Sequence, residues 1–236
     1  MDRAEFDKFA DEYAALHAQN IKISGEGPDF FAAYKIDDVK HDVARSGTFP
    51  KSPTLVDVGS GVGNSVSHFR RNFPDASLIC LDVSERSLKI AEERFPGQAD
   101  YLHFDGTEFP LRDNSADLGF AACVLHHVDP AFHVPLLTEF RRILKPQGWL
   151  FIFEHNPLNP LTVQAVNTCP FDENAELIRG GKLRDLFVEA GFSDIKLRYR
   201  LFFPRFLSGL RGAEPFLTWL PLGAQYYVVA RKNTVE

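Results

Sequence analysis

The stretch Leu55-Val56-Asp57-Val58-Gly59-Ser60-Gly61-Val62-Gly63 decides the fold of this chain of 236 residues. Its apolar beginning is typical of a buried parallel strand, and its three alternating glycines let the backbone turn sharply against a ligand that a side chain would exclude. A helix from Asn64 to Arg71 should follow, with its N-terminus directed at that ligand. The sequence therefore predicts a strand–turn–helix unit that binds its ligand through backbone atoms.

The glycine pattern differs from the two common phosphate-binding motifs. A dinucleotide fingerprint would carry its third glycine where this chain has Asn64, and no lysine follows the glycines as a P-loop requires. The carboxylate of Asp57 at the strand end would also repel a diphosphate. A cationic or hydroxyl-rich ligand suits this turn better.

Asp57 and the three glycines match Asp/Glu-x-Gly-x-Gly-x-Gly, the first motif of the class I S-adenosylmethionine-dependent methyltransferases, which this chain resembles. The resemblance covers residues 54–155 closely and the order of elements up to residue 232 more loosely. It implies an α/β fold that is Rossmann-like and doubly wound. Its mostly parallel seven-stranded sheet would have an antiparallel last strand beside the fifth. Gln147-Gly148 stands where the family often has Gly-Gly, a departure that affects a turn and not the cofactor.

Two further acidic residues follow strand-like runs. Asp82 ends the run 77–81, 19 residues after Gly63, where a Rossmann-like second strand places a carboxylate on a ribose diol. Asp105 ends the run 101–104, and the family uses an acid there for the adenine amino group. The resemblance implies S-adenosyl-L-methionine as cofactor and S-adenosyl-L-homocysteine as product. The predicted cofactor-binding residues are Asp57, Gly59, Ser60, Gly61, Gly63, Asp82, Val83, Asp105, Gly106 and Cys123.

Three histidines follow the next two predicted strands, 117–124 and 150–154. The carboxyl ends of parallel strands meet at one edge, so His126, His127 and His155 should face one crevice, where an acceptor would bind. A sulfonium methyl group is already activated, so the protein has to align an acceptor and remove a proton where necessary.

We predict His155 as the proton acceptor, His127 as the second choice and His126 as a third candidate, because imidazole accepts a proton near neutral pH. Glu154 would first need its pKa raised. The alternative is that these histidines only cap a helix or orient a loop. They lack a dedicated carboxylate cluster, so we predict no metal.

Composition limits the function classes. Three cysteines, an odd number, predict neither a disulfide framework nor a metal-binding pair. A net charge of −6 weighs against duplex nucleic acid as a partner. No apolar stretch reaches the ~20 residues of a membrane span, and the N-terminus is charged, which predicts a cytoplasmic protein without a membrane span.

The chain should form one structural domain with two parts. Residues 1–50 predict an N-terminal helical lid, with helices over 2–18 and 29–45, although a helix pair that only packs on the core is the alternative. Residues 51–236 predict the cofactor-binding core, with a helix over 180–190 and strands over 195–201 and 225–230. The aromatic segment 201–222 should bury its rings against the sheet, in a homodimer interface or as an apolar cover over the acceptor.

These features predict transfer of a methyl group from S-adenosylmethionine to a small-molecule acceptor, with oxygen preferred over carbon or nitrogen. A non-catalytic regulator that binds the same cofactor would share every motif. A nicotinamide-dependent oxidoreductase is the third alternative. Its turn spacing differs, and no Tyr-x-x-x-Lys follows the fourth strand.

Overall fold

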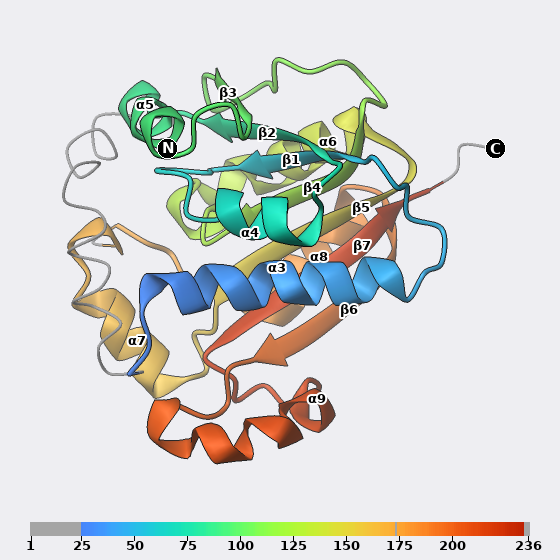
Figure 1. Cartoon of the computed structure of the whole chain (residues 1–236). Coiled ribbons are helices and arrows are strands. Elements are labelled where there is room, and N and C mark those ends of the chain that lie inside the picture. The colour runs from blue at the N-terminus through green and yellow to red at the C-terminus, as the bar shows by residue number, and fades with distance from the viewer. Residues whose placement is uncertain (1–24, 173, 234–236) are drawn as a thin grey trace.

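The computed structural model describes residues 25–172 and 174–233 (Figure 1). The predicted first helix, 2–18, lies outside these residues. A seven-stranded sheet has the order β3-β2-β1-β4-β5-β7-β6. Its strands are β1 (Thr54–Val58), β2 (Ser77–Asp82), β3 (Asp100–His103), β4 (Ala116–Ala122), β5 (Leu144–His155), β6 (Phe192–Arg200) and β7 (Gln225–Lys232).

The last strand, β7, lies between β5 and β6, which both precede it in the chain. β1 to β5 pair in parallel, whereas β7 is antiparallel to both β5 and β6. The predicted α/β fold with an antiparallel last strand beside the fifth is confirmed. The helices are α3 (Pro28–Ala44), α4 (Val66–Asn72), α5 (Glu85–Arg94), α6 (His133–Ile143), α7 (Pro160–Asn167), α8 (Gly180–Glu189) and α9 (Glu214–Leu217). Short 3-10 helices are η2 (Leu125–His127), η3 (Pro130–Phe132), η4 (Pro170–Asp172) and η5 (Arg205–Ala213).

Side chains alternate between two cores, one on each face of the sheet. Even-numbered residues of β5, such as Leu150 and Ile152, pack in one core with α6 and α8. Odd-numbered residues, such as Phe151 and Phe153, pack in the other core with α3 and α4. Figure 1 shows α3 and α4 in front of the sheet and α6 and α8 behind it. Helices on both faces explain why the central strands read as nearly continuous apolar runs.

Hydrogen bonds and ion pairs hold helix α3 against strands β6 and β7. Asp42 accepts from Arg198 at 2.9 Å and from the Tyr227 hydroxyl at 3.0 Å, and Arg200 donates to Asp38 at 2.6 Å. The helix predicted over 29–45 is therefore present, and it packs along β6 and β7.

Two expectations from the sequence were wrong in their extent. The strand predicted over 150–154 runs from Leu144 to His155, because its first residues also pair with β4 across an irregular register. Burial of the aromatic segment 201–222 against the sheet, one of its three predicted placements, is wrong for several rings, whereas the homodimer interface and the cover over the acceptor stay predictions. In this chain Phe206 is 81% exposed, Phe216 79% and Trp219 73%, since η5 and α9 lie on the outside beyond β6. Among the described residues no helix has the length and apolar character needed to cross a membrane.

Candidate functional site

The glycine turn after β1 is folded back onto the end of β2. The amides of Gly59 and Ser60 both donate to the Leu81 carbonyl, at 2.8 and 3.1 Å, and the Gly61 amide donates to an Asp82 carboxylate oxygen at 2.8 Å. All three glycines of the motif have positive φ, 71°, 52° and 78° along the chain, which L side chains rarely adopt. The turn is thus held in place by the second strand.

The three glycines are required for different reasons. A Cβ on Gly59 would lie 2.4 Å from a Val124 methyl carbon, and one on Gly63 would lie 3.1 Å from the Cβ of Ala91. A Cβ on Gly61 would meet nothing within 4 Å. Two glycines therefore allow the turn to pack against the protein, while the third presents bare backbone to open space where a ligand can approach.

Asp57 supplies a buried carboxyl group beneath this turn. Its side chain is 2% exposed, and its Oδ2 has no hydrogen-bond partner among the described residues; the same holds for the buried hydroxyl of Ser60. Burial, reinforced by the nearby charge of Asp82, raises the pKa of Asp57 to about 8. Buried polar atoms without partners are uncommon and suit a polar ligand at this turn.

Asp82 lies at the end of β2 with both oxygens in use. Besides the Gly61 amide, it accepts from the Ser84 amide at 2.8 Å. Ser84 is in turn the N-cap of α5, since its hydroxyl accepts from the Ser87 amide. The carboxylate thus lies against the glycine turn. A group that binds the ribose of a ligand at this turn would have to lie in this position.

Asp105 and Gly106 form the turn after β3. One Asp105 oxygen accepts from the hydroxyl and amide of Thr107 at 2.6 and 2.9 Å, and these hydrogen bonds lower its pKa. Gly106 has a φ of 90°, and a Cβ there would lie 3.6 Å from a Val83 methyl carbon. Val83 and Gly106 are thus neighbours at the same edge of the sheet as Asp82.

Cys123, at the end of β4, lies in a polar cluster with two side chains from α3. Lys35 approaches its sulfur at 3.7 Å, and the Gln225 amide nitrogen at 3.9 Å. Tyr34 donates its hydroxyl to Gln225. Burial favours the neutral thiol, but the charges of His155 and Lys35 lower its pKa to about 7. The helix α3 therefore contributes polar groups to the edge that carries the glycine turn.

The three predicted histidines do lie close together, around Glu154. The rings of His126 and His127 have centroids 4.2 Å apart, and those of His126 and His155 5.3 Å. Glu154 is fully buried; one oxygen accepts from the Val124 and Leu125 amides, and the other lies 2.5 Å from Nδ1 of His126.

The ionic state of this cluster differs from the sequence expectation. Burial opposes protonation of His126, but the carboxylates of Glu154 and Asp172 outweigh it and raise the pKa of His126 to about 10. Burial would raise the pKa of Glu154, yet His126 lowers it. His126 is therefore a protonated imidazole near neutral pH and a poor proton acceptor, and Glu154 is its anionic partner.

His155 has a different environment. Its Nδ1 lies 3.4 Å from the Gln225 amide nitrogen, and it faces Cys123. Burial lowers the pKa of His155, but the thiolate of Cys123 more than compensates, so the pKa lies above its ordinary value. Its side chain is only partly buried, at the end of β5.

Two participants were not singled out as site residues from the sequence. Asp172 lies 3.5 Å from Nε2 of His126 and 3.4 Å from Nε2 of His127, although it is about 45 residues away in the chain. Gln225 comes from the last strand. Glu154 also belongs to the site, and its position directly before His155 at a strand end could have indicated this from the sequence. No local sequence pattern indicates Asp172 or Gln225.

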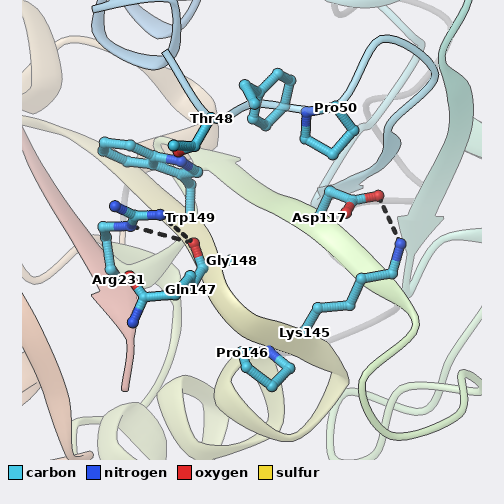
Figure 2. A pocket seen from close by; sticks show the side chains of 10 residues that line it. Thr48, Pro50, Asp117, Lys145, Pro146, Gln147, Gly148, Trp149 and Arg231 are labelled. Atoms are coloured by element: carbon cyan, nitrogen blue, oxygen red, sulfur yellow. Dashed lines mark hydrogen bonds and ion pairs between the residues drawn. The ribbon is translucent and has the colours of Figure 1, made fainter. Parts of the chain in front are cut away.

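A pocket lies at the opposite edge of the sheet (Figure 2). It has a volume of about 290 Å³ and lies between the segment before β1 and the beginnings of β4 and β5. Lys145 is paired with Asp117 at 2.8 Å, and Arg231 donates to the Gln147 carbonyl while lying 4.8 Å above the Trp149 ring. Its charged side chains already have partners within the protein, so the carboxyl edge is the better candidate.

Residues 56–152 match a family model described as "Methyltransferase domain". Among curated proteins, a demethylmenaquinone methyltransferase of Chlamydia pneumoniae is 30% identical over 105 residues, 44% of this chain and 45% of that protein. A trans-aconitate 2-methyltransferase of Acidovorax sp. is 37% identical over 107 residues, 44% of this chain and 38% of that protein. The chain matches less than half the length of these relatives.

Solved structures share the whole fold. A SAM-dependent methyltransferase of Thermotoga maritima has a TM-score of 0.66 at 22% identity, over 98% of this chain and 99% of that one. A phosphoethanolamine N-methyltransferase of Haemonchus contortus, solved with S-adenosyl-L-methionine, has a TM-score of 0.66 at 18% identity, over 97% of this chain and 60% of that one.

Proposed function

We propose that the chain is an S-adenosylmethionine-dependent methyltransferase that transfers the methyl group of this cofactor to an oxygen atom of a small-molecule acceptor. The match of residues 56–152 to a methyltransferase domain and the fold shared with solved S-adenosylmethionine-dependent methyltransferases support the family and the cofactor. The names of the two curated relatives, which refer to demethylmenaquinone and trans-aconitate, support a small molecule as acceptor.

The observation that carries the proposal is the open backbone at Gly61, between the unpartnered oxygen of Asp57 and the carboxylate of Asp82. Hydroxyl groups of a ribose would give Asp82 donors, and Val83, Asp105 and Gly106 lie along the same edge for the base. Ser60, Gly59, Gly63 and Cys123 complete the predicted cofactor contacts. When bound, S-adenosylmethionine supplies a methyl group that is already activated for transfer.

The residues of this chain then have to orient the acceptor and remove its proton. We propose that a ring nitrogen of His155, Nε2 or Nδ1, accepts the proton of the acceptor. His126 cannot do so, because the carboxylate of Glu154 keeps it protonated. A neutral His155 is required, and its pKa is raised, so the rate should increase as the pH rises through that pKa. His127 remains the second candidate.

The first experiment is calorimetry with S-adenosylmethionine, S-adenosylhomocysteine and NAD. We expect the first two to bind and NAD not to bind. Incubation with methyl-labelled cofactor and a metabolite extract, with trans-aconitate and a demethylmenaquinone analogue added separately, then identifies the product and the atom methylated. Cofactor binding with no product from any acceptor would favour a non-catalytic regulator, and binding of NAD alone would favour the oxidoreductase alternative.

Once an acceptor is known, His155→Ala should lower the turnover rate by roughly 10²–10⁴ and leave cofactor affinity nearly unchanged. The matched control is His41→Ala, an exposed histidine on α3. Near-normal turnover in His155→Ala together with a large loss in His127→Ala would move the role to His127. The cytoplasmic location, the absence of duplex nucleic acid as a partner and the homodimer through segment 201–222 stay predictions.

A further inference from the structure

His126, His127 and Asp172 form a compact set of metal-ligating atoms beside the proposed acceptor site. One ring nitrogen of each imidazole and one Asp172 oxygen all lie within 4.8 Å of one another. The carboxylate oxygen is 3.5 Å from Nε2 of His126 and 3.4 Å from Nε2 of His127. Ligands ~2.1 Å from a tetrahedral ion are about 3.4 Å apart, so both distances match such a centre.

The surroundings of Nε2 of His126 also favour a bound ion. Its side chain is buried, and its Nε2 has no well-directed hydrogen-bond partner among the described residues, although Asp172 is near. Its other ring nitrogen, Nδ1, is held by Glu154 at 2.5 Å. In the metal-free chain His126 is protonated on both ring nitrogens, so an ion would displace the proton of Nε2 and bind there while Nδ1 keeps donating to that carboxylate. A carboxylate that fixes the far nitrogen of an imidazole is the usual support of a metal-binding histidine.

The backbone also holds the cluster together. The two histidines lie in η2 directly after β4, and the segment after η4 is attached to them by the Glu176 amide, which donates to the His126 carbonyl at 2.8 Å. His133 supports the same turn from α6 by contacting the Leu125 and Val128 carbonyls, each at 2.9 Å. The ligands therefore come from two separate elements, η2 and η4, and α6 supports the first of them.

An ion would have a path to this cluster. The His127 side chain is 12% exposed and that of Asp172 11%, whereas His126 is 1% exposed. The cluster is thus buried on the side of Glu154 and reaches solvent through small exposed parts of the other two side chains. Three protein ligands with one open side are typical of sites that keep a coordination position for a small molecule.

We propose that His126, His127 and Asp172 bind a divalent transition-metal ion of the zinc type. Two imidazoles with one carboxylate suit such an ion better than Mg²⁺ or Ca²⁺, which prefer oxygen ligands. The nitrogens of the two histidines have to move slightly closer to one another around the ion. The sequence predicted no metal because Asp172 is distant in the chain, and folding supplies the missing carboxylate.

The open coordination position suggests a use for the ion, and this part rests on the proposed function. An acceptor with a carboxylate or hydroxyl oxygen would bind the metal and be held beside His155, whose ring lies 5.3 Å from that of His126. Coordination would also make an acceptor hydroxyl more acidic, so that its proton is removed more easily.

Metal binding is tested directly, without cofactor or acceptor. The full-length protein is freed of metal with a chelator, and Zn²⁺ is added in competition with a chromophoric chelator. Co²⁺ is added in parallel, because its visible absorption reports ligand type and coordination number. We expect one ion per chain, with a Co²⁺ spectrum of mixed nitrogen and oxygen ligands.

Two ligand variants and two matched controls decide the assignment. His127→Ala and Asp172→Asn should each weaken Zn²⁺ binding by at least about 100-fold, more than the 10–100-fold typical of changes to groups that only orient ligands. The exposed controls His41→Ala and Asp75→Asn should leave binding unchanged. Circular dichroism confirms folding of each variant.

Absence of stoichiometric Zn²⁺ binding, or binding that persists in both ligand variants, would overturn the metal site and leave the cluster as a salt-bridged imidazolium. Because this test needs neither cofactor nor acceptor, its failure would leave the proposed methyl transfer intact. Conversely, a protein that binds Zn²⁺ in this way but not S-adenosylmethionine would keep the metal site and refute the proposed function.

Discussion

Single side chains at the carboxyl edge of the sheet combine structural and binding roles. Asp82 accepts from the Gly61 amide on the glycine turn and from the Ser84 amide at the start of α5. A carboxylate anchored at both oxygens by rigid backbone needs no rearrangement to meet a ribose. Its position therefore makes it the most direct test of how the cofactor is held.

We expect Asp82→Ala to weaken S-adenosylmethionine binding about 10- to 150-fold, since hydrogen bonds to a charged acceptor contribute on the order of 1.5–3 kcal/mol. Calorimetry measures the dissociation constant, with the exposed Asp75→Ala as the control. Asp82→Asn, which keeps one acceptor oxygen, should fall between the two. An unchanged affinity in a folded Asp82→Ala protein would place the ribose elsewhere.

His155, His126 and Glu154 illustrate how neighbours decide chemistry. The same imidazole side chain is a stable cation at His126, where a buried carboxylate faces it, and a titrating group at His155, where a thiol does. Residue type alone could not separate these roles, because the pKa depends on partners that the fold brings together.

At the scale of the element, the glycine turn separates packing from ligand binding. Gly59 lies against Val124 at the end of β4, so its missing side chain allows β1 and β4 to end side by side. Gly61 has no such neighbour. The two positions therefore predict different phenotypes for the same substitution.

Gly59→Ala should destabilise the fold for two reasons. The new Cβ would lie 2.4 Å from a Val124 methyl carbon, and the alanine would have to keep the positive φ of this position. Gly61→Ala should cost only the backbone strain, roughly 1–2 kcal/mol, while it obstructs the cofactor. Urea unfolding and cofactor calorimetry on both variants check this. Equal losses of stability would show that Gly61 also packs against the protein, and normal cofactor affinity in Gly61→Ala would mean that the ligand does not approach there.

Helix α3 brings side chains of the site to the end of β4. Its buried side chains follow the helical repeat, and it was predicted as part of a lid. Asp42 and Asp38 bind arginines of β6, which anchors the helix on the sheet while it carries Tyr34 and Lys35 to Cys123. Its role as part of a lid stays a prediction.

At the scale of the molecule, a buried acid beneath the glycine turn connects the site to overall stability. Asp57 keeps its proton in the folded chain up to a pH of about 8, whereas the ordinary value of 3.8 applies in the unfolded chain. Between these two values the folded state binds more protons. The contribution of Asp57 to the free energy of unfolding should therefore decrease as the pH rises from about 4 to 8 and change no further above that range.

Asp57→Asn removes this contribution because an amide does not titrate. Without cofactor, we expect the variant to gain stability relative to the wild-type chain as the pH rises, by at most about 1.4 kcal/mol per pH unit within that window. Urea unfolding at several pH values measures the difference, with Asp75→Asn as the exposed control. Parallel stability curves would show that Asp57 is ionised in the fold.

Local sequence was sufficient for much of the architecture. The alternation of apolar residues and the turn chemistry located the sheet strands, the Ser84 cap of α5 and the helix over 180–190, because these depend on neighbours in the chain. Composition did not decide where the aromatic segment 201–222 lies. Phe206, Phe216 and Trp219 are exposed and not buried against the sheet, which leaves the homodimer interface and the cover over the acceptor as predictions.

The glycine turn, the acids after β1 to β3 and the predicted cofactor class could be recognised without coordinates, since each lies within a short motif of fixed spacing. Folding was needed to establish which groups meet on the acceptor side. Asp172 reaches His126 and His127 across about 45 residues, Gln225 reaches His155 across 70, and Glu154 becomes the partner of His126. The physical reason is that charge state and ligand sets depend on distance in space, and crossover connections bring distant strand ends to one edge of the sheet.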